Sequence, residues 1–239
     1  MALDVRTDAP AELPADRPAL VLVYGQEAVA VHQPGVRPWR KSYLITKRAT
    51  DITLSLLLLP VLLPVMTVCA LLIWLEDPGP VMFSKERTGL GGTPFKMFKF
   101  RTMVTNAEEL KRKYAHLNEH TWPDFKITND PRVTRVGRFL RRTSFDELPQ
   151  VFNVLKGEMS LVGPRPTSFP VSTYLLRHTE RLEVRPGITG LWQVSGRGDV
   201  DFEDRIALDV EYIEKQSIWF DIKILLSTFS VVFRGRGAY

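Results

Sequence analysis

The sequence predicts an α+β protein, mainly helical, that attaches to a membrane through an apolar helix interrupted by proline. Three observations predict this class. They are an uncharged run of 24 residues at 52–75, a hairpin pattern around the glycine turn at 90–92, and helical patterns at 131–142, 144–155 and 206–233. With 239 residues, the chain is long enough for one domain with a core and an appendage.

The chain divides into three predicted parts, which are residues 1–46, 47–80 and 81–239. The first part holds five prolines, five acidic residues and five basic residues without a sustained period, so we expect a flexible arm. An apolar patch at 19–31 is too short to span a bilayer and lacks the basic start of a signal peptide. The second part is a membrane helix, and the third is a cytosolic domain.

The apolar run at 52–75 is long enough for a transmembrane helix, but Pro60 and Pro64 lie near its middle. Cut at Pro64, each half is about 12 residues or roughly 18 Å, against a hydrocarbon core of roughly 30 Å. Both flanks are rich in lysine and arginine, which indicates that both ends lie on the same side. The pattern favours a re-entrant helix that enters and returns, over a proline-kinked span or a buried core helix.

The net charge of +5 and the pI near 9.4 favour anionic partners. A hairpin is expected over 81–103, with its basic residues close to the lipid surface, and we include Lys99 and Arg101 among the substrate-binding candidates.

The segment 129–142 opens like a helix with Asp130 as its cap and Pro131 in the first position, and it carries five arginines. A solvated helix face is the alternative. No nucleic-acid-binding motif accompanies this charge, so phosphate-bearing lipids or metabolites are favoured over nucleic acid. The single cysteine excludes an internal disulfide.

The stretch "SFDELPQ" at 144–150 has a structural and a chemical interpretation. Ser144 and Glu147 are spaced as a capping box, which predicts a helix start. Asp146 and Glu147 are also an acidic pair next to Arg141, and this arginine should favour the charged form of Asp146. Adjacent carboxylates on a helix point about 100° apart, which argues against a glycosidase pair.

Three further segments supply candidates for substrate contact or membrane contact. Arg165 lies between two prolines, whose fixed φ angles stiffen its backbone, although a plain surface turn fits as well. Arg197 ends a loop with three glycines. The helical pattern at 206–233 could lie in the membrane interface or pack on the domain core.

Several of these motifs, in this order, resemble the bacterial polyprenyl-phosphate sugar-1-phosphate transferases, which are monotopic phosphoglycosyl transferases that begin exopolysaccharide and glycoconjugate assembly. The similarity runs from about Lys47 to the C-terminus through "KRATD", "FKMFKFRTM", "RRTSFDELPQVFNVLKGEMSLVGPRP", "VRPGITGLWQVSGR" and "ALDVEYI". The resemblance implies a re-entrant helix broken at Pro64, at the cytoplasmic face of the bacterial inner membrane. Family members often have serine before this proline, where this chain has Leu63.

The resemblance also implies the site. It makes Asp146 a covalent nucleophile beside Glu147, with Mg²⁺ as the cofactor held by both carboxylates. It places four further residues around the active site, namely Arg141, Arg165, Arg197 and Asp209.

The implied reaction takes two steps, in which a UDP-sugar gives its sugar-1-phosphate to Asp146 with release of UMP and then to undecaprenyl phosphate. A carboxylate and a lipid phosphate are both already anionic, so neither needs a general base. The alternative is a membrane glycosyltransferase that moves only the sugar and releases UDP, since "DVD" at 199–201 resembles a metal-binding aspartate motif. A non-catalytic basic membrane adaptor is a third hypothesis. The identity of the sugar and the oligomeric state, a homodimer included, stay open.

Overall fold

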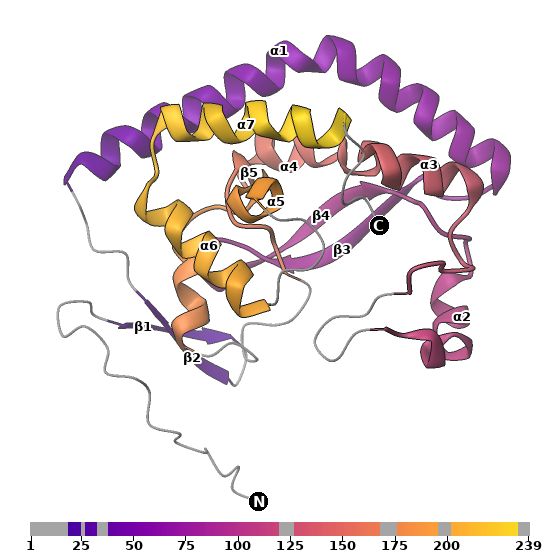
Figure 1. Cartoon of the computed structure of the whole chain (residues 1–239), viewed down its shortest axis with the longest axis horizontal. Helices are drawn as coiled ribbons and strands as arrows, with labels where there is room; N and C mark the ends of the chain where they lie inside the picture. The colour runs from indigo at the N-terminus through magenta and orange to yellow at the C-terminus, as the bar shows by residue number, and fades with distance from the viewer. Residues whose placement is uncertain are drawn as a thin grey trace, which may run out of the picture.

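The computed structural model describes residues 19–24, 27–32, 38–119, 127–167, 176–195 and 202–233. Figure 1 shows a long helix arching over a smaller mixed layer of helices and strands. The helices are α1 (Pro38–Glu76), α2 (Ala107–Lys113), α3 (Arg135–Thr143), α4 (Gln150–Lys156), α5 (Leu191–Ser195), α6 (Phe202–Glu214) and α7 (Ile218–Phe233). The strands are β1 (Ala19–Tyr24), β2 (Glu27–His32), β3 (Met82–Thr88), β4 (Pro94–Phe100), β5 (Ser160–Val162) and β6 (Gly187–Thr189). The 3₁₀ turns are η1 (Leu90–Gly92), η2 (Ala115–Leu117), η3 (Phe145–Glu147) and η5 (Leu176–Glu183).

Within the described residues, the strands form three separate two-stranded sheets. β3 and β4 are the antiparallel hairpin that the sequence predicts, with Met82 opposite Phe100 and Thr88 opposite Pro94. β5 and β6 pair in parallel. β1 and β2 form a second antiparallel hairpin within the segment expected to be a flexible arm, and β2 contacts η5. The predicted α+β class with mainly helical content is therefore confirmed.

Helix α1 is continuous through Pro60 and Pro64, so the structure has one bowed helix where the sequence suggested two halves. Its curvature is plain in Figure 1. Interior prolines remove intrahelical hydrogen bonds, and the Thr67 hydroxyl donates to the carbonyl of Leu63 at 2.9 Å, a contact that often bends helices. Within the described residues, Lys41–Glu76 is the one helix long and apolar enough to cross a membrane, and only 17% of its most apolar window is buried.

Helix α1 is fixed at its N-terminal end by a polar cluster on α7. Asp221 accepts hydrogen bonds from the Tyr43 hydroxyl at 3.0 Å, from Lys47 Nζ at 2.8 Å and from the Tyr212 hydroxyl at 2.7 Å. The carboxylate is buried, and three donors satisfy it, as a charge in such a position requires. The contact between α1 and α7 therefore includes directional hydrogen bonds, which fix how the two helices are aligned, in addition to apolar packing.

Two predicted helix starts are wrong. Helix α3 begins at Arg135, where the Thr134 hydroxyl accepts from the backbone N–H of Gly137 at 2.9 Å. Asp130 does not cap it, because its carboxylate is bound to the Arg132 guanidinium at 2.6 Å. The arginines of this segment are accordingly not one solvated face, since the side chain of Arg132 is buried before the helix begins.

The capping box at Ser144 is also absent. Ser144 ends α3 in the left-handed region (φ 59°, ψ 18°) and makes no side-chain cap. Glu147 cannot reach back to it, because its carboxylate faces Lys99 and Arg165. Helix α4 begins only at Gln150, after Pro149.

Candidate active site

The acidic pair lies on a short turn that joins two helices. Asp146 and Glu147 belong to η3, which follows the C-terminus of α3 and precedes α4. Ser144 is the only residue other than glycine with a positive φ among the described residues. A serine held in this region costs about 1–3 kcal/mol and persists where surrounding structure enforces it, often at functional sites. The strained turn therefore presents both carboxylates between α3 and α4.

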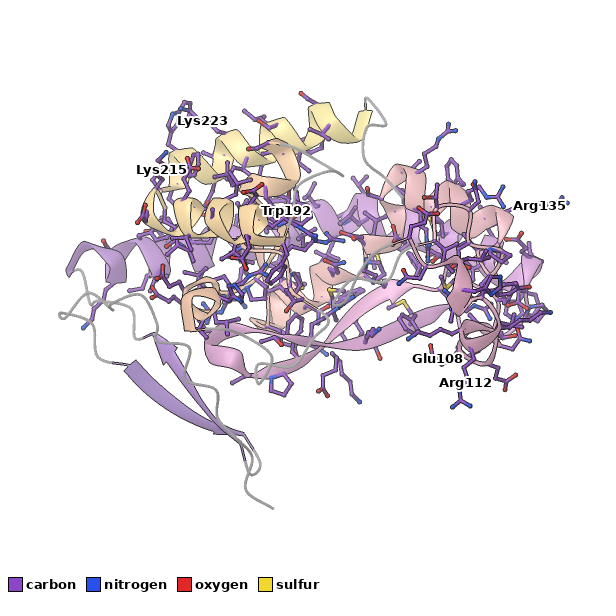
Figure 2. All side chains as sticks on the ribbon, turned by 60° about the horizontal axis from the view of Figure 1, so that its bottom comes forward. Glu108, Arg112, Arg135, Trp192, Lys215 and Lys223 are labelled. Carbon is purple, nitrogen blue, oxygen red and sulfur yellow. The ribbon has the colours of Figure 1, made fainter. Side chains whose placement is uncertain are left out.

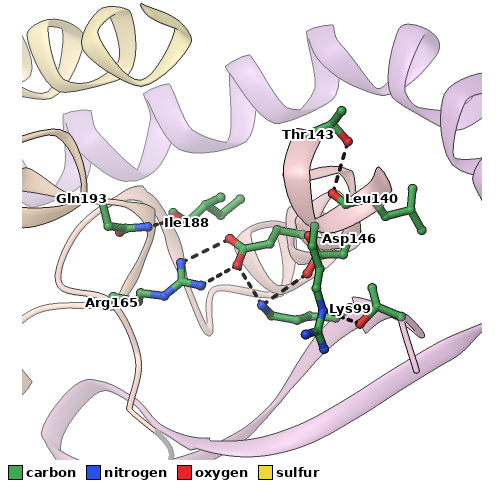
Figure 3. Close-up of polar contacts among 10 residues, drawn as sticks. Lys99, Leu140, Thr143, Asp146, Arg165, Ile188 and Gln193 are labelled. Atoms are coloured by element: carbon green, nitrogen blue, oxygen red, sulfur yellow. Dashed lines mark hydrogen bonds and ion pairs between the residues drawn. The ribbon is translucent and has the colours of Figure 1, made fainter. Parts of the chain in front are cut away.

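Glu147 is fully paired with two cations from different elements. Its Oε1 lies 2.7 Å from Lys99 Nζ of β4 and 2.5 Å from Arg165 Nη2, and its Oε2 lies 3.3 Å from Arg165 Nη1. Figure 3 shows Arg165 and Lys99 reaching the acidic pair from two different directions. Burial by itself would raise the pKa of Glu147, but the charges and hydrogen bonds of Arg165 and Lys99 outweigh it and hold this pKa well below its ordinary value.

Asp146 has the opposite environment. Its side chain is 12% exposed, and its one ion pair within the described residues is a loose one, 3.7 Å from Oδ2 to Lys99 Nζ. Burial raises the pKa of Asp146, Glu147 adds to the rise, and Lys99, Arg165 and Arg141 oppose it without cancelling it. Arg141 favours the charged form of Asp146, as expected, but desolvation is larger than this attraction, so the net pKa is raised.

Arg141 is held by Thr102, in the segment that follows β4. Its Nε donates to the Thr102 hydroxyl at 2.9 Å, and burial lowers the pKa of its guanidinium. The backbone of Thr102 also touches α3 closely, since a Cβ added at Gly137 would lie 2.0 Å from the Thr102 carbonyl oxygen. Glycine at 137 thus allows the end of β4 and α3 to meet, and this contact fixes Arg141.

Arg165 is positioned by the strand pair beneath it. It follows β5, and a Cβ at Gly163 would lie 2.5 Å from the carbonyl oxygen of Arg185, so only glycine fits at this crossing. The Arg165 carbonyl accepts from Arg181 Nη2 at 2.7 Å. About two thirds of the Arg165 side chain is buried, and one third of it remains exposed. Its guanidinium is therefore both held and reachable.

Two predicted site residues, Arg101 and Asp209, do not meet the acidic pair in the described structure. Arg101 binds Asp77 at the end of α1, with 3.1 Å between Nη1 and Oδ2. Asp209 is 1% exposed and pairs with Arg181 Nη2 at 2.6 Å. Arg197 lies outside the described residues. Asp209 therefore supports the site indirectly, through Arg181 and the backbone of Arg165.

Arg181 is the supporting residue that sequence reasoning missed. It lies in η5, within a polar stretch that carries no motif, and its importance depends on η5 packing against α6 and the Arg165 turn. Burial raises the pKa of its partner Asp209 to about 6, with Arg181 and Arg205 opposing the rise. No local pattern marks such a contact, because its two partners are far apart along the chain.

The acidic pair fits a divalent cation only in part. Both oxygens of Glu147 already accept from Arg165 or Lys99, whereas Asp146 keeps an oxygen that is not hydrogen-bonded within the described residues. No cluster of three or more His, Cys, Asp or Glu side chains suited to a metal occurs in the described part of the chain. Mg²⁺ usually takes one or two carboxylates together with substrate phosphates, so Asp146 and a bound diphosphate would form such a set.

The site as a whole suits an anionic phosphate substrate. Lys99, Arg141 and Arg165 outnumber the two carboxylates, so the local charge is positive even with both acids ionised. Cations on fixed backbones stabilise charge on a transferring phosphoryl group. The arrangement therefore combines one carboxylate that is locked into ion pairs with one that is free to react.

Comparison with known proteins identifies the family of the chain. The bacterial sugar transferase family matches residues 42–235 of this chain. The chain belongs to the bacterial sugar transferase family. The family match covers most of α1, the β3–β4 hairpin, the acidic pair and the helices up to α7, which are the elements that build the site.

Two of the similar relatives carry names that contain undecaprenyl phosphate, and a third is named for exopolysaccharide production. The chain is 45% identical to the undecaprenyl-phosphate galactose phosphotransferase of Salmonella typhimurium over 84% of its own length and 43% of the relative. It is 43% identical to the UDP-glucose:undecaprenyl-phosphate glucose-1-phosphate transferase of Escherichia coli, over 82% of this chain and 42% of that one. It is 38% identical to the exopolysaccharide production protein ExoY of Rhizobium meliloti, over 82% of this chain and 88% of the relative. The chain thus spans less than half the length of the first two and most of the third.

Proposed function

We propose that the protein transfers a sugar-1-phosphate from a UDP-sugar to undecaprenyl phosphate. In the first step, a carboxylate oxygen of Asp146 attacks the phosphorus that bears the sugar, and the bond from this phosphorus to the UMP oxygen breaks, so that UMP leaves with the electron pair. In the second step, an oxygen of the lipid phosphate attacks the same phosphorus and the Asp146 carboxylate is released. The product is a lipid diphosphate sugar.

The observation that carries this proposal is the unequal pairing of the two acids. Glu147 is neutralised by Lys99 and Arg165, whereas Asp146 sits beside the same cations without a short ion pair. A raised pKa makes the ionised Asp146 more basic and hence a better nucleophile, at the cost of a smaller ionised fraction at low pH. The neighbouring cations lie where charge on the phosphate would need to be stabilised.

The substrate classes are proposed from the relatives. The names of the Salmonella and Escherichia proteins contain undecaprenyl phosphate as the acceptor, and the Escherichia name contains UDP-glucose as the donor. Galactose and glucose both occur among these names, so the sugar is left open here. A basic site beside a membrane helix accommodates both an anionic donor and an anionic lipid.

We propose that α1 is re-entrant and that the domain lies on the cytoplasmic face of the bacterial inner membrane. Both ends of α1 contact the same domain: Lys47 binds Asp221 of α7 at 2.8 Å near one end, and Glu76 accepts from the Arg135 N–H of α3 at 2.7 Å at the other. A folded domain lies on one side of a bilayer, so a helix that crosses completely could not make both contacts. The middle of α1, with Leu57 and Val61 more than 60% exposed, would then be the part in the lipid.

Helix α7 supports the same placement. Its apolar residues Trp219, Leu226 and Phe229 are each at least 60% exposed and lie on one helical face with Ile222. Lys223 Nζ stands over the Trp219 ring at 5.7 Å and points outward in Figure 2. An exposed aromatic and apolar face with a lysine beside it is typical of helices that lie in the membrane interface.

Mg²⁺ remains part of the proposal as the cofactor. Asp146 and the donor phosphates would hold it, with Glu147 joining only by releasing Lys99 or Arg165. When bound, it would neutralise charge that develops on the transferring phosphoryl group. The protein's own cations, Lys99 and Arg165, orient the same group.

The proposal is tested by the nucleotide that is released. Purified protein in lipid nanodiscs is incubated with Mg²⁺ and a panel of UDP-sugars, with and without undecaprenyl phosphate. We expect UMP with the acceptor, and without it one UMP per active protein together with a phosphosugar adduct on Asp146 in the mass spectrum. Release of UDP would support sugar-only transfer, and no nucleotide from any donor would support a membrane adaptor. Either result overturns the proposal.

A further inference from the structure

The membrane helix and the acidic turn share one apolar cluster. Met66, Cys69 and Ile73 of α1 are buried against Leu140 of α3 and Phe100 of β4. Phe145 and Leu148, which flank the acidic pair directly, pack on this cluster together with Phe152 of α4. The turn that carries Asp146 and Glu147 therefore rests on the C-terminal half of the membrane helix.

Glu76, at the C-terminal end of α1, binds the N-terminus of α3. Its two carboxylate oxygens accept from the backbone N–H groups of Arg135 at 2.7 Å and Val136 at 2.8 Å. These amides have no partner within α3, because the first N–H groups of any helix lack one. An anion at the positive end of the helix dipole strengthens the contact. Glu76 thus fixes the start of the helix that ends at the acidic turn.

Arg48, in the N-terminal part of α1, binds the C-terminus of α4. Its Nη1 donates to the carbonyl of Val154 at 2.5 Å and its Nη2 to the carbonyl of Leu155 at 2.9 Å. A Cβ added at Gly157, the C-cap residue of α4, would lie 3.4 Å from Arg48 Nη2, so the guanidinium is in van der Waals contact with the end of this helix. A cation is the charge that suits the negative end of a helix.

We infer that α1 acts as a brace for the acidic turn, with Arg48 and Glu76 as positioning residues that hold α4 and α3 at a fixed separation. The two contacts have opposite charge and meet opposite helix ends, on the outer ends of the two helices that flank η3. Asp146 is consequently held in place by helix α1. The kinetic part of this inference rests on the proposed function.

The inference is tested with four variants and two controls, in the full chain in nanodiscs. Arg48→Ala and Glu76→Ala remove each contact, whereas Arg48→Lys and Glu76→Gln keep part of it. Lys41→Ala removes an exposed cation from the same end of α1, and Glu109→Gln neutralises an exposed acid on α2. The readouts are kcat and donor KM from UMP release, and backbone hydrogen exchange over residues 135–156.

We expect the two alanine variants to lower kcat about 10- to 100-fold with donor KM changed less than about twofold, since a misplaced nucleophile slows chemistry without weakening binding. Exchange at the amides of Arg135 and Val136 should accelerate in Glu76→Ala, and exchange over the last turn of α4 should accelerate in Arg48→Ala. The conservative variants should recover part of both effects, and the controls should show neither.

The brace is contradicted if exchange over 135–156 stays at the wild-type level, if donor KM alone rises, or if the controls match the alanine variants. Should an alanine variant fail to fold, the lysine and glutamine variants give the same readouts with smaller effects. Hydrogen exchange needs no substrate, so a wild-type protein that releases no UMP would refute the proposed reaction while this measurement still decides the brace.

Discussion

Asp146 and Asp209 are two largely buried aspartates next to basic side chains, and only one is placed to react. Asp209 is 1% exposed and touches Arg181 at 2.6 Å, whereas Asp146 is 12% exposed and stays 3.7 Å from Lys99. Burial raises the pKa of both acids. The difference is that the Asp209 carboxylate is closed off from solvent against Arg181, although neither of its oxygens accepts a hydrogen bond in the described structure, while Asp146 keeps an oxygen that a substrate could meet.

The comparison shows how one residue type supplies support in one place and chemistry in another. The Asp209–Arg181 pair holds the carbonyl of Arg165, and Arg165 in turn holds Glu147 beside the nucleophile. A chain of polar contacts thus connects the buried Asp209–Arg181 pair to the more exposed acidic pair. Reactivity depends on which carboxylate is left loosely paired and not on the number of charges nearby.

The largest effect that would test this comparison is on turnover. Asp146→Asn removes the proposed nucleophile and should reduce UMP release on the order of 10⁴-fold or more, as loss of a covalent nucleophile does elsewhere. Asp209→Asn should reduce it less than about 10-fold, because the side chain acts only through Arg181. Asp204→Asn, an exposed aspartate on α6, is the matched control and should be unchanged. Native turnover in Asp146→Asn would refute the assignment.

The next largest effect is on the free energy of unfolding, which should respond differently to the loss of each of the two carboxylates of the turn. Glu147→Gln leaves Lys99 and Arg165 without their anion and should lower the free energy of unfolding by about 2 kcal/mol, less than for a fully buried pair because Arg165 is partly exposed. Asp146→Asn should lower it little or not at all, since its environment already disfavours the charged form. Chemical denaturation measures both.

The control for that measurement is Glu211→Gln, which breaks an exposed i,i+4 pair with Lys215 at 2.6 Å. It should cost no more than about 0.5 kcal/mol. Equal losses in Glu147→Gln and Asp146→Asn would contradict the unequal pairing of the two carboxylates.

A smaller effect should appear in the pH dependence of stability. The pKa of Asp209 is about 6 in the folded protein against an ordinary value of 3.8, so the folded state holds this proton more tightly than the unfolded state. Its contribution to stability is complete below pH 3.8 and is lost as the pH rises through about 6. The free energy of unfolding of wild type relative to Asp209→Asn should therefore fall over this window. If the difference between wild type and Asp209→Asn rose with pH instead, the pKa of Asp209 could not be raised in the folded protein.

The smallest effect concerns the acid limb of the pH–rate profile. Because burial raises the pKa of Asp146, turnover should fall on acidification with an apparent pKa above 3.8, a value that belongs to the coupled pair. Lys99 lowers the pKa of Asp146, so Lys99→Gln should shift this limb to higher pH. Lys96→Gln, an exposed lysine on the same strand, should leave it in place. A shift to lower pH in Lys99→Gln would exclude Asp146 as the titrating nucleophile.

Much of the architecture was predictable because it depends on local patterns. The uncharged run predicted the apolar helix, the glycine turn at 90–92 predicted the hairpin β3–β4, and the motif around Asp146 and Glu147 predicted the acidic pair and its family. Arg165 and Lys99 were also predicted as site residues, and both contact Glu147. These features depend on residues that are close along the chain or on motifs that stay together.

Other features were mispredicted because a distant side chain competes with the local pattern. The capping box at Ser144 has the right residues, but Lys99 and Arg165 take the glutamate that would complete it. Asp130 has the right spacing for a cap, but it binds Arg132, and Glu76 from α1 supplies acceptors for the first amides of α3. A cap is decided by which partner lies nearest in space.

By itself, the sequence determined the apolar helix, the β3–β4 hairpin and the identity of the acidic pair, because periodicity, proline and glycine act within a few residues. Only the tertiary structure decided that Asp146 is loosely paired, that Asp209 is sealed with Arg181, and that burial raises the pKa of Asp146 in spite of Arg141. Desolvation and ion pairing depend on how segments distant in the chain pack together. A pattern within one segment does not contain that information.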